Sequence, residues 1–298
     1  MSQSFERAKS RLDNIKAIEP LLSALRTMSM GAWQMANNKI ANMEKFETNY
    51  DSILFEILPH IHQGKVQKYK NINLSPSTAD TIVLIVGSER GLCGKFNDSL
   101  IDNSLKWVKE SNETSYQIWA MGSRLIRKLD QREINFTWRK PLPASDLTSF
   151  QEAFITTQKW IEQFESYDFN QFFVLYNQLE TGGRYQFSTF QLLPVEVEDL
   201  HTKQSQATTK WPPPIIETDP KGIYRQIVQN DIASNYYQIL LKSAAAEHAA
   251  RFNLMQDAKD NAEEIIEELR QIINSERKRK ITQQMQELAA GAGLLDNK

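Results

Sequence analysis

The sequence predicts an α/β protein in which a mostly parallel sheet is joined to an antiparallel two-helix coiled coil, formed by the first and last helices. Between residues 81 and 194, short apolar runs alternate with helical stretches, a pattern typical of a sheet covered by helices. The segments on either side carry helical apolar periodicity throughout. We therefore expect three parts: an N-terminal coiled-coil helix over 1–60, an α/β domain over 73–210 and a long C-terminal helix over 215–298.

The first segment, residues 4–58, reads as one long helix. Its apolar side chains recur at spacings of three and four, namely Leu12, Ile15, Ile18, Leu22, Leu25, Met28, Met35, Ile40 and Met43. Pro20 removes a backbone donor inside this pattern, so we expect a kink or a break near Ala17–Glu19. An ordinary amphipathic surface helix is the alternative, and the length favours a coiled-coil arm.

The middle region alternates in type along the chain. Residues 81–86 are wholly apolar and mostly β-branched, as in a strand that is covered on both faces. The pattern resembles a Rossmann-like domain, with linkers at 73–78 and 200–214. Strands are expected at 81–86, 116–120, 133–138, 172–176 and 185–194, and helices at 97–109, 122–129 and 150–164.

The last helix is expected to run from about residue 221 to 295. Seventy helical residues reach about 105 Å, which exceeds the width of a small domain. Apolar residues recur about every seven positions, which indicates a coiled-coil seam. One series is Leu241, His248, Met255, Ala262 and Leu269, and the other is Ala245, Phe252, Ile266 and Ile273.

A basic run at 277–280 interrupts this seam, and apolar residues then resume. These are Ile281, Met285, Leu288, Leu294 and Leu295. Because the last helix is the longer one, we expect its final turns to stand clear of the pair and to fit a socket in a partner protein. Nucleic-acid binding by the basic run is a weaker interpretation, since no aromatic residues are interleaved with it.

Composition narrows the possible functions. The net charge of −2 points neither to nucleic acid nor to an anionic membrane surface. Cys93 is the single cysteine, so no disulfide can form within the chain, and a reducing compartment is expected. No apolar run is long enough to span a bilayer, and the start lacks a signal-peptide core. We therefore expect membrane association only through a partner.

The glycine-containing segment 87–94 follows a strand and precedes a helix, which is the context of a phosphate-binding loop. Its glycines fit neither nucleotide-binding pattern, so a structural turn containing Arg90, Gly91, Cys93 and Gly94 is the preferred interpretation. An activated thiol at Cys93 is the alternative. The histidines do not cluster with acids at metal spacing. We expect no catalytic group, cofactor or metal.

Several motifs are similar to those of one family. They are Ser243-Ala-Ala-Ala-Glu-His-Ala-Ala-Arg251, Ser88-Glu-Arg-Gly-Leu-Cys-Gly94 with Asn97, and Asn274, Arg277 and Ile281-Thr-Gln283 near the end. They resemble the gamma subunit of F-type ATP synthases, along the whole chain and in order. The first helix departs most, because Pro20, Ser23 and Ala32 stand where that family usually has lysines.

This resemblance implies a non-catalytic rotor subunit of the central stalk, which couples transmembrane ion flow to ATP synthesis or hydrolysis on surrounding subunits. The implied partners are a hexameric ring of catalytic and non-catalytic subunits, an epsilon-type subunit and a membrane rotor ring, without nucleic acid or direct membrane insertion. The implied location is peripheral, at the cytoplasmic side of the plasma membrane or an equivalent energy-transducing membrane. The residues expected to contact the ring are Leu25, Arg26, Met28, Arg277, Thr282, Gln283, Met285 and Leu288.

Three alternatives remain open. The chain is compatible with a diverged paralogue of the gamma subunit, because of the lost lysines. It is also compatible with a coiled-coil adaptor or tether that does not rotate. A Rossmann-type enzyme with helical arms is the third alternative, and it predicts nucleotide binding by the α/β domain.

Overall fold

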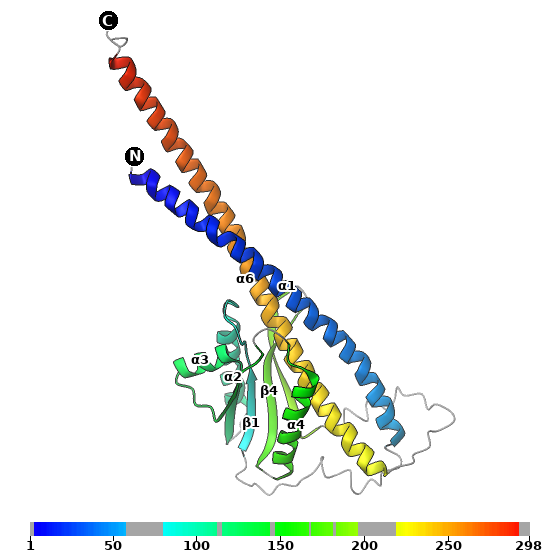
Figure 1. Ribbon diagram of the computed structural model, residues 1–298. Coiled ribbons are helices and arrows are strands. Elements are labelled where there is room, and N and C mark those ends of the chain that lie inside the picture. Colours follow the sequence, from blue (N-terminus) through cyan, green and yellow to red (C-terminus); the bar gives the residue numbers. More distant parts are fainter. Residues whose placement is uncertain are drawn as a thin grey trace. The chain divides into compact units, whose positions relative to one another are not determined.

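The computed structural model describes residues 3–57, 80–111, 115–143, 147–166, 168–180, 183–195 and 219–291 (Figure 1). The chain forms two compact units. The smaller unit combines Met1–Ser29 with Phe252–Lys298, and the larger unit is Met30–Arg251. Helices α1 (Gln3–Ile57) and α6 (Pro220–Gly291) contribute residues to both units.

A five-stranded sheet with the order β3-β2-β1-β4-β5 forms the centre of the larger unit. The strands β3, β2, β1 and β4 run parallel, and β5 runs antiparallel to β4. This confirms the mostly parallel α/β fold. The strand bounds are β1 Asp80–Val86, β2 Tyr116–Met121, β3 Trp138–Lys140, β4 Phe169–Leu179 and β5 Tyr185–Leu193.

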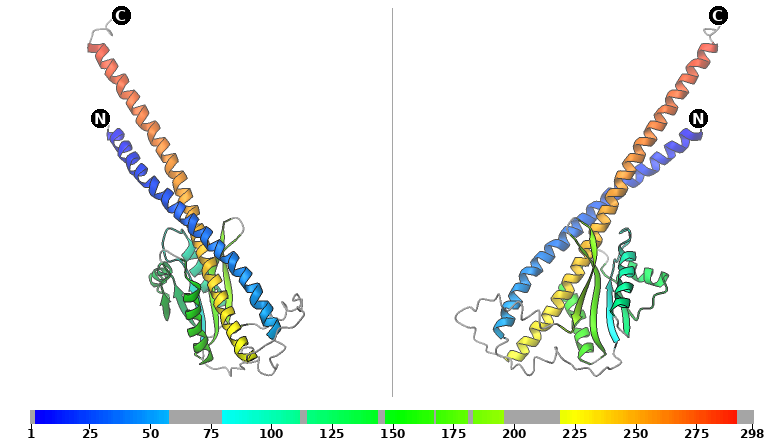
Figure 2. Two further views of the ribbon diagram at one scale, coloured as in Figure 1. Left: turned by 45° about the vertical axis from the view of Figure 1, so that its right-hand side comes forward. Right: turned by 180° about the vertical axis from the view of Figure 1, so that it is seen from behind.

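Helices cover both faces of this sheet (Figure 2). Helices α2 (Phe96–Glu110) and α3 (Ser123–Gln131) pack on one face, against Val83 and Ile85 of β1. Helix α4 (Phe150–Glu165) and the first part of α6 pack on the other, against Ile82, Leu84 and Val86. Alternate residues of the central strand thus enter two different cores, which explains its unbroken apolar sequence.

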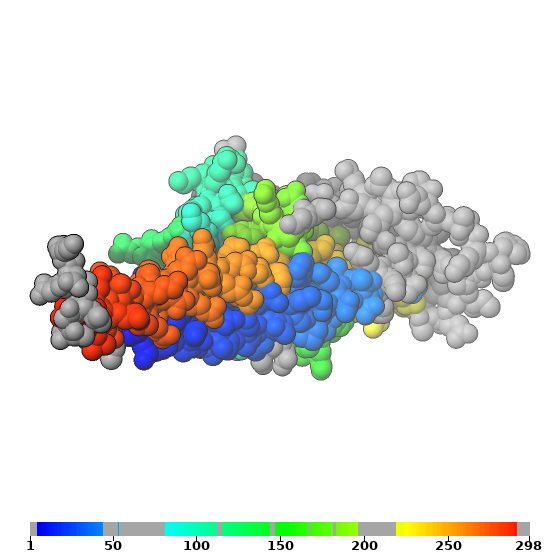
Figure 3. All heavy atoms as spheres, turned by 90° about the horizontal axis from the view of Figure 1, so that it is seen from above, coloured from blue at the N-terminus to red at the C-terminus, as the bar shows by residue number. Residues whose placement is uncertain are grey.

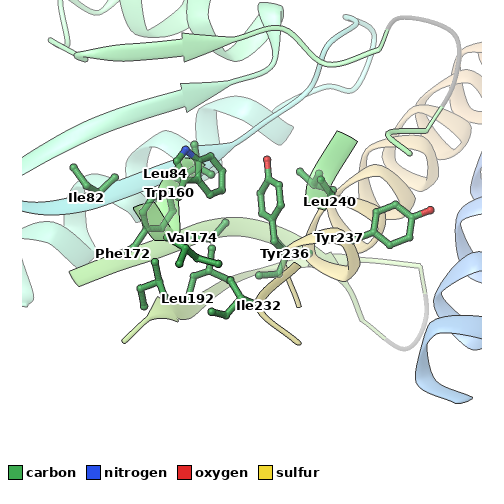
Figure 4. Packing of buried hydrophobic residues seen from close by; sticks show 14 of the residues in the cluster. Ile82, Leu84, Trp160, Phe172, Val174, Leu192, Ile232, Tyr236, Tyr237 and Leu240 are labelled. Carbon is green, nitrogen blue, oxygen red and sulfur yellow. The ribbon is translucent and has the colours of Figure 1, made fainter. Parts of the chain in front are cut away.

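Large aromatic side chains fill the core beneath α4 and α6 (Figure 4). The ring of Trp160 lies 4.7 Å from that of Phe172 and 4.8 Å from that of Tyr236, measured between centroids. The Tyr236 hydroxyl lies 3.4 Å from the sulfur of Met121. Complete burial raises the pKa of Tyr236, with a smaller contribution from Glu152.

Of the kink or break predicted near Pro20, the break is wrong, because α1 continues through Pro20, and the kink stays a prediction. Proline leaves the carbonyl of Lys16 without its helical donor. Pro20 lies on the exposed side of α1, where water can satisfy that carbonyl. An extended helix survives a proline more easily on such a face than inside a core.

The strand expected at 133–138 is also wrong, since β3 begins only at Trp138. Residues 133 and 134 instead terminate α3. Glu133 takes a left-handed conformation with φ of 55°, its amide bonds the Asp130 carbonyl, and the Ile134 amide bonds the Leu129 carbonyl. This is the Schellman pattern of a helix end, which usually has glycine at the left-handed position. Glutamate there gives no sequence signal.

Helix α6 begins at Pro220, directly after the capping residue Asp219. Asp219 accepts hydrogen bonds from the amides of Lys221 and Gly222, both at 3.3 Å, and Pro220 occupies the first helical turn, where its missing donor costs nothing. The linkers expected at 73–78 and 200–214, together with Leu294 and Leu295, lie outside the described residues. Among the described helices, none combines the length and the apolar character that crossing a membrane requires.

Candidate functional site

In the smaller unit, the start of α1 and the second half of α6 pack side by side (Figure 3). The pairing is antiparallel, since the first residues of α1 meet the later residues of α6. Ala8 and Leu12 bury themselves against Ile266, Leu269 and Ile273. Farther along α1, the guanidinium of Arg26 donates to the Gln256 side chain and lies 5.8 Å from the centre of the Phe252 ring.

The heptad positions predicted on α6 are mostly buried, and packing of the seam against α1 is present at Ile266, Leu269 and Ile273, whereas Leu241 packs into the core of the sheet. Met255, Ala262, Leu269, Ile266 and Ile273 are buried in the smaller unit. In the larger unit, Leu241 and Ala245 are buried and His248 is half-buried. Phe252, the first α6 residue of the smaller unit, is half-buried as well. A period near 3.5 residues keeps one face of a helix turned to its partner, so the sequence pattern located this face correctly.

The face predicted on α1 is partly wrong. Ile18 and Met28 are exposed, Leu25 is half-buried, and Met35 in the larger unit is exposed as well. Ser29 is buried instead. Two apolar stripes run along this part of α1, displaced by one residue and therefore by about 100°. Only one of them can face α6, and the sequence of α1 does not distinguish between them.

Beyond Ile273, α6 leaves the seam. We call residues 277–288 the distal segment, and all of them are exposed. The apolar side chains Ile281, Met285 and Leu288 are 50, 66 and 73 % exposed. The expected free end of the helix is therefore present among the described residues, and its large apolar side chains are not covered by α1.

The residues expected to contact a surrounding ring form two separate groups. Leu25, Arg26 and Met28 lie on α1, where Arg26 contacts Phe252 and Gln256 and Met28 is 62 % exposed. The second group follows on α6, about 30 Å farther along the helix. Two of its polar members bond within their own helix: Thr282 donates to the Lys278 carbonyl at 3.0 Å and Gln283 to the Glu287 carboxylate at 2.9 Å. This second group consists of Arg277, Thr282, Gln283, Met285 and Leu288.

In the larger unit, residues 87–94 form a tightly bonded turn after β1. The Ser88 amide donates to the Asn97 side-chain oxygen at 3.0 Å, and the Asn97 amide group donates to the Ser88 hydroxyl at 2.7 Å. A side chain at Gly87 would lie 2.6 Å from Leu125. Both Leu92 and Gly94 adopt positive φ angles. These contacts support the structural interpretation of this turn, which stays a prediction.

The turn holds a carboxylate from α6 where a phosphate-binding loop would hold its ligand. Glu247 accepts hydrogen bonds from the backbone amides of Arg90 and Glu89 and from the Arg251 guanidinium. Arg251 also donates to the Gly91 carbonyl at 3.1 Å. Burial raises the pKa of Glu247, while Arg251 and the two amides act in the opposite direction. Because amides that would cradle a phosphate are already engaged, the geometry disfavours nucleotide binding here.

Cys93 is buried under this turn, with its sulfur 3.6 Å from the Ser88 hydroxyl. Burial raises the pKa of the thiol, outweighing the hydrogen bond with Ser88. A reactive cysteine requires exposure and the opposite shift, so the burial of Cys93 disfavours the alternative of an activated thiol. Among the described residues, no three His, Cys, Asp or Glu side chains gather at metal-binding distance.

Glu89 fastens the turn to two further elements. Its carboxylate accepts from the Ser123 amide at 2.8 Å, the Ser123 hydroxyl at 2.6 Å and the Leu142 amide at 2.8 Å. Burial acts to raise the pKa of Glu89, but these hydrogen bonds hold it below its ordinary value. The carboxylate thus satisfies the first amide of α3 and ties the segment after β3 to the same turn.

His248 gives the larger unit a testable dependence on pH. Arg251 can only donate, so the His248 Nδ1 atom 3.0 Å away accepts, and the ring is neutral. Burial, with Arg251 and then Arg90, lowers the pKa of His248 to about 4. The unfolded chain takes up this proton near pH 6.5 and the folded chain does not. Stability should therefore fall as pH drops from about 6.5 towards 4, by up to about 3 kcal/mol.

The measurement is urea unfolding of the full chain at pH 7 and at pH 4.5, with His248→Gln as the comparison, since glutamine can still accept from Arg251. We expect a smaller pH-dependent loss of unfolding free energy in the variant. Equal losses in both proteins would show that His248 does not cause the effect.

Sequence reasoning assigned no role to Glu247 and Arg251. The available signal was an acid and a base four residues apart within an alanine-rich stretch. Small residues on a helix allow close packing, so charged side chains among them are candidates for a buried pair rather than for a solvated one.

Comparisons with known proteins agree on one family. A family model described as ATP synthase matches residues 4–295. The ATP synthase gamma chain of Levilactobacillus brevis is 25 % identical over 100 % of this chain and 100 % of that protein. That of Fusobacterium nucleatum is 23 % identical, over 96 % of this chain and 98 % of the other.

Solved structures show the same fold. A chain from the OSCP/F1/c-ring structure of the Euglena gracilis mitochondrial ATP synthase has a TM-score of 0.61 at 13 % identity, and the match covers 100 % of this chain and 98 % of that one. A chain from the central stalk and c-ring of the Tetrahymena thermophila mitochondrial ATP synthase has a TM-score of 0.57 at 19 % identity, covering 80 % and 99 %.

Proposed function

The chain belongs to the ATP synthase family, whose model spans residues 4–295, and on this basis we propose that it is the gamma-type rotor subunit of an F-type ATP synthase that transmits rotation through its paired helices. It is a non-catalytic subunit of that complex. The observation that carries the proposal is the antiparallel helix pair, in which helix α6 continues past the seam into an exposed apolar segment.

The mechanism requires no bond chemistry on this chain. Rotation of an asymmetric shaft presents different contacts to each surrounding subunit in turn. These contacts stabilise a different conformation of each subunit, and each conformation has its own affinity for nucleotide. Ion flow and nucleotide chemistry are thereby coupled through differential contacts. A paired helix suits this task because burial of one seam along both helices resists bending.

The partners proposed are a hexameric ring of catalytic and non-catalytic subunits, an epsilon-type subunit and a membrane rotor ring. The structural neighbours support this, because their descriptions name the central stalk, the F1 part and the c-ring. Exposed Met28, Met285 and Leu288 are the best-placed apolar contacts for the ring. Arg26 is already engaged with Gln256 and Phe252, so we assign it mainly to holding the helix pair. Leu25, Arg277, Thr282 and Gln283 complete the proposed contact set.

The subunit is a peripheral component of an energy-transducing membrane complex. We propose the cytoplasmic side of the plasma membrane as its location. The division into residues 1–60, 73–210 and 215–298 stays a prediction.

Purification of the tagged full chain from its native cells tests this function. A rotor subunit should bring down a six-membered nucleotide-binding ring, at one copy of this chain per ring by quantitative mass spectrometry. A tether that does not rotate would give no such fixed ratio. Calorimetry of the full chain with ATP and with dinucleotides tests the enzyme alternative, and measurable binding would favour it.

A further inference from the structure

We propose that Ser243, Glu247 and Arg251 of α6, together with the turn 87–94, form a torsional joint that fixes the rotational orientation of α6 on the sheet. This inference rests on the proposed rotor function. It makes the three α6 residues positioning residues, because they act by holding the shaft rather than by touching a nucleotide site.

The three side chains lie on one side of α6, spaced four residues and therefore about 6 Å apart. Each bonds a backbone group after or at the end of β1. Ser243 donates to the Val86 carbonyl at 3.3 Å, Glu247 accepts from the amides of Arg90 and Glu89, and Arg251 donates to the Gly91 carbonyl at 3.1 Å. Backbone partners cannot change rotamer, so these bonds define one orientation of the helix.

The receiving side of the joint is itself well anchored. The turn continues β1, which is the central strand of the sheet. It is bonded to α2 through Asn97, and to Ser123 of α3 and Leu142 through Glu89. A twisting load that enters at Glu247 or Arg251 is therefore shared among several elements instead of deforming one loop.

The contacts of the preceding α6 turns with the sheet are mainly apolar. Ile232, Tyr236 and Leu240 pack into the apolar core under α6, and apolar attraction is not directional. Such packing opposes separation of helix and sheet more than it opposes a small rotation about the helix axis. Arg225 donates to the Glu165 side chain of α4 at 2.9 Å and Tyr236 to the Met121 sulfur, but side chains can change rotamer. Ser243, Glu247 and Arg251 bond instead to backbone groups of β1 and its turn, and Arg251 is the last α6 residue of the larger unit. They thus stand where torque passes from the sheet into the helix pair.

Burial of this ion pair is difficult to explain by stability alone. Ser243, Glu247 and Arg251 are all buried, and removing two charges from water costs free energy that their attraction only partly returns. Apolar residues of similar volume are often at least as stabilising at such sites. What the charged pair adds is direction, which a torque-bearing contact requires.

The test replaces the pair with apolar side chains of similar size, Glu247→Met with Arg251→Leu, in the assembled complex. The matched control is the exposed pair Lys106 and Glu110 of α2, also four residues apart and joined at 3.8 Å, changed to leucine and methionine. A probe bead is attached through Asn103→Cys on the exposed side of α2, the ring is fixed to a surface, and angular fluctuations of the bead are recorded.

We expect the angular variance to rise at least twofold in the Glu247/Arg251 variant and to stay unchanged in the control. Unchanged variance in an assembled, rotating complex that contains the Glu247/Arg251 variant would overturn the joint and leave the rotor function intact. Failure of the unmodified chain to join or rotate in the ring would instead overturn the function itself. If the variant does not assemble, Ser243→Ala removes one bond of the joint and should raise the variance by a smaller factor; no rise would also overturn the joint.

Discussion

Removing residues 278–298 is expected to abolish ion pumping by the assembled complex while ATP hydrolysis stays close to the wild-type rate. The deletion takes away Ile281, Met285 and Leu288, whose exposed apolar surface we assign to partner contacts. It leaves the seam intact, because the last buried seam residue is Ile273. The measurement is ATPase activity and ATP-driven ion transport in membrane vesicles that carry the complex.

The stability of the isolated chain should change little on this deletion, by about 0.5 kcal/mol or less, since the described residues that are lost make few buried contacts. A full-length variant with Ile281, Met285 and Leu288 all changed to glutamine separates apolar contact from helix length. We expect it to lose most of the pumping as well. Unimpaired pumping in both variants would remove the distal segment from the coupling mechanism.

Replacing Tyr236 with alanine is expected to cost the larger unit about 3–5 kcal/mol of unfolding free energy. The Tyr236 ring is wholly buried and packs against Trp160. The neighbouring Tyr237, whose ring contacts Phe150, belongs to the same apolar cluster. The folded state therefore has no way to fill the volume without moving several aromatic side chains. Urea unfolding followed by tryptophan fluorescence measures the change, since Trp160 reports on this core directly.

Tyr236→Phe is the matched control. The hydroxyl of Tyr236 donates to the Met121 sulfur at 3.4 Å, and a thioether is a weak acceptor. The phenylalanine variant should therefore lie within about 1 kcal/mol of the wild type. A large loss in this variant would mean that the hydroxyl, rather than the volume of the ring, stabilises the core.

Much of the fold was predictable because the relevant signals are local. The apolar run 81–86 identifies a strand covered on both faces, and β1 is that strand. The heptads of α6 identify the buried face of that helix from Met255 to Ile273. Two errors arose where a local signal was weak. Glutamate at position 133 conceals a helix end, and an exposed proline at position 20 does not break α1.

The candidate site was less predictable, because its geometry depends on contacts distant in sequence. The sequence contains the recognisable motifs Ser88–Gly94 and Ser243–Arg251, but nothing in either motif shows that they bond to each other. Glu247 accepts hydrogen bonds from the backbone amides of Arg90 and Glu89, which lie more than 150 positions earlier in the sequence. Likewise, the orientation of Met28 away from α6 follows from the choice between two apolar stripes on α1.

By itself, the sequence determined the α/β class, the two long helices, the seam of α6 and the family to which the chain belongs, because periodicity and motifs are properties of consecutive residues. Only the tertiary structure decided which stripe of α1 is buried, how the turn after β1 receives the ion pair of α6, and that the proposed ring contacts form two groups. These outcomes depend on which surfaces meet in space. A side chain buried against one partner face is no longer available to any other, and no single segment encodes that choice.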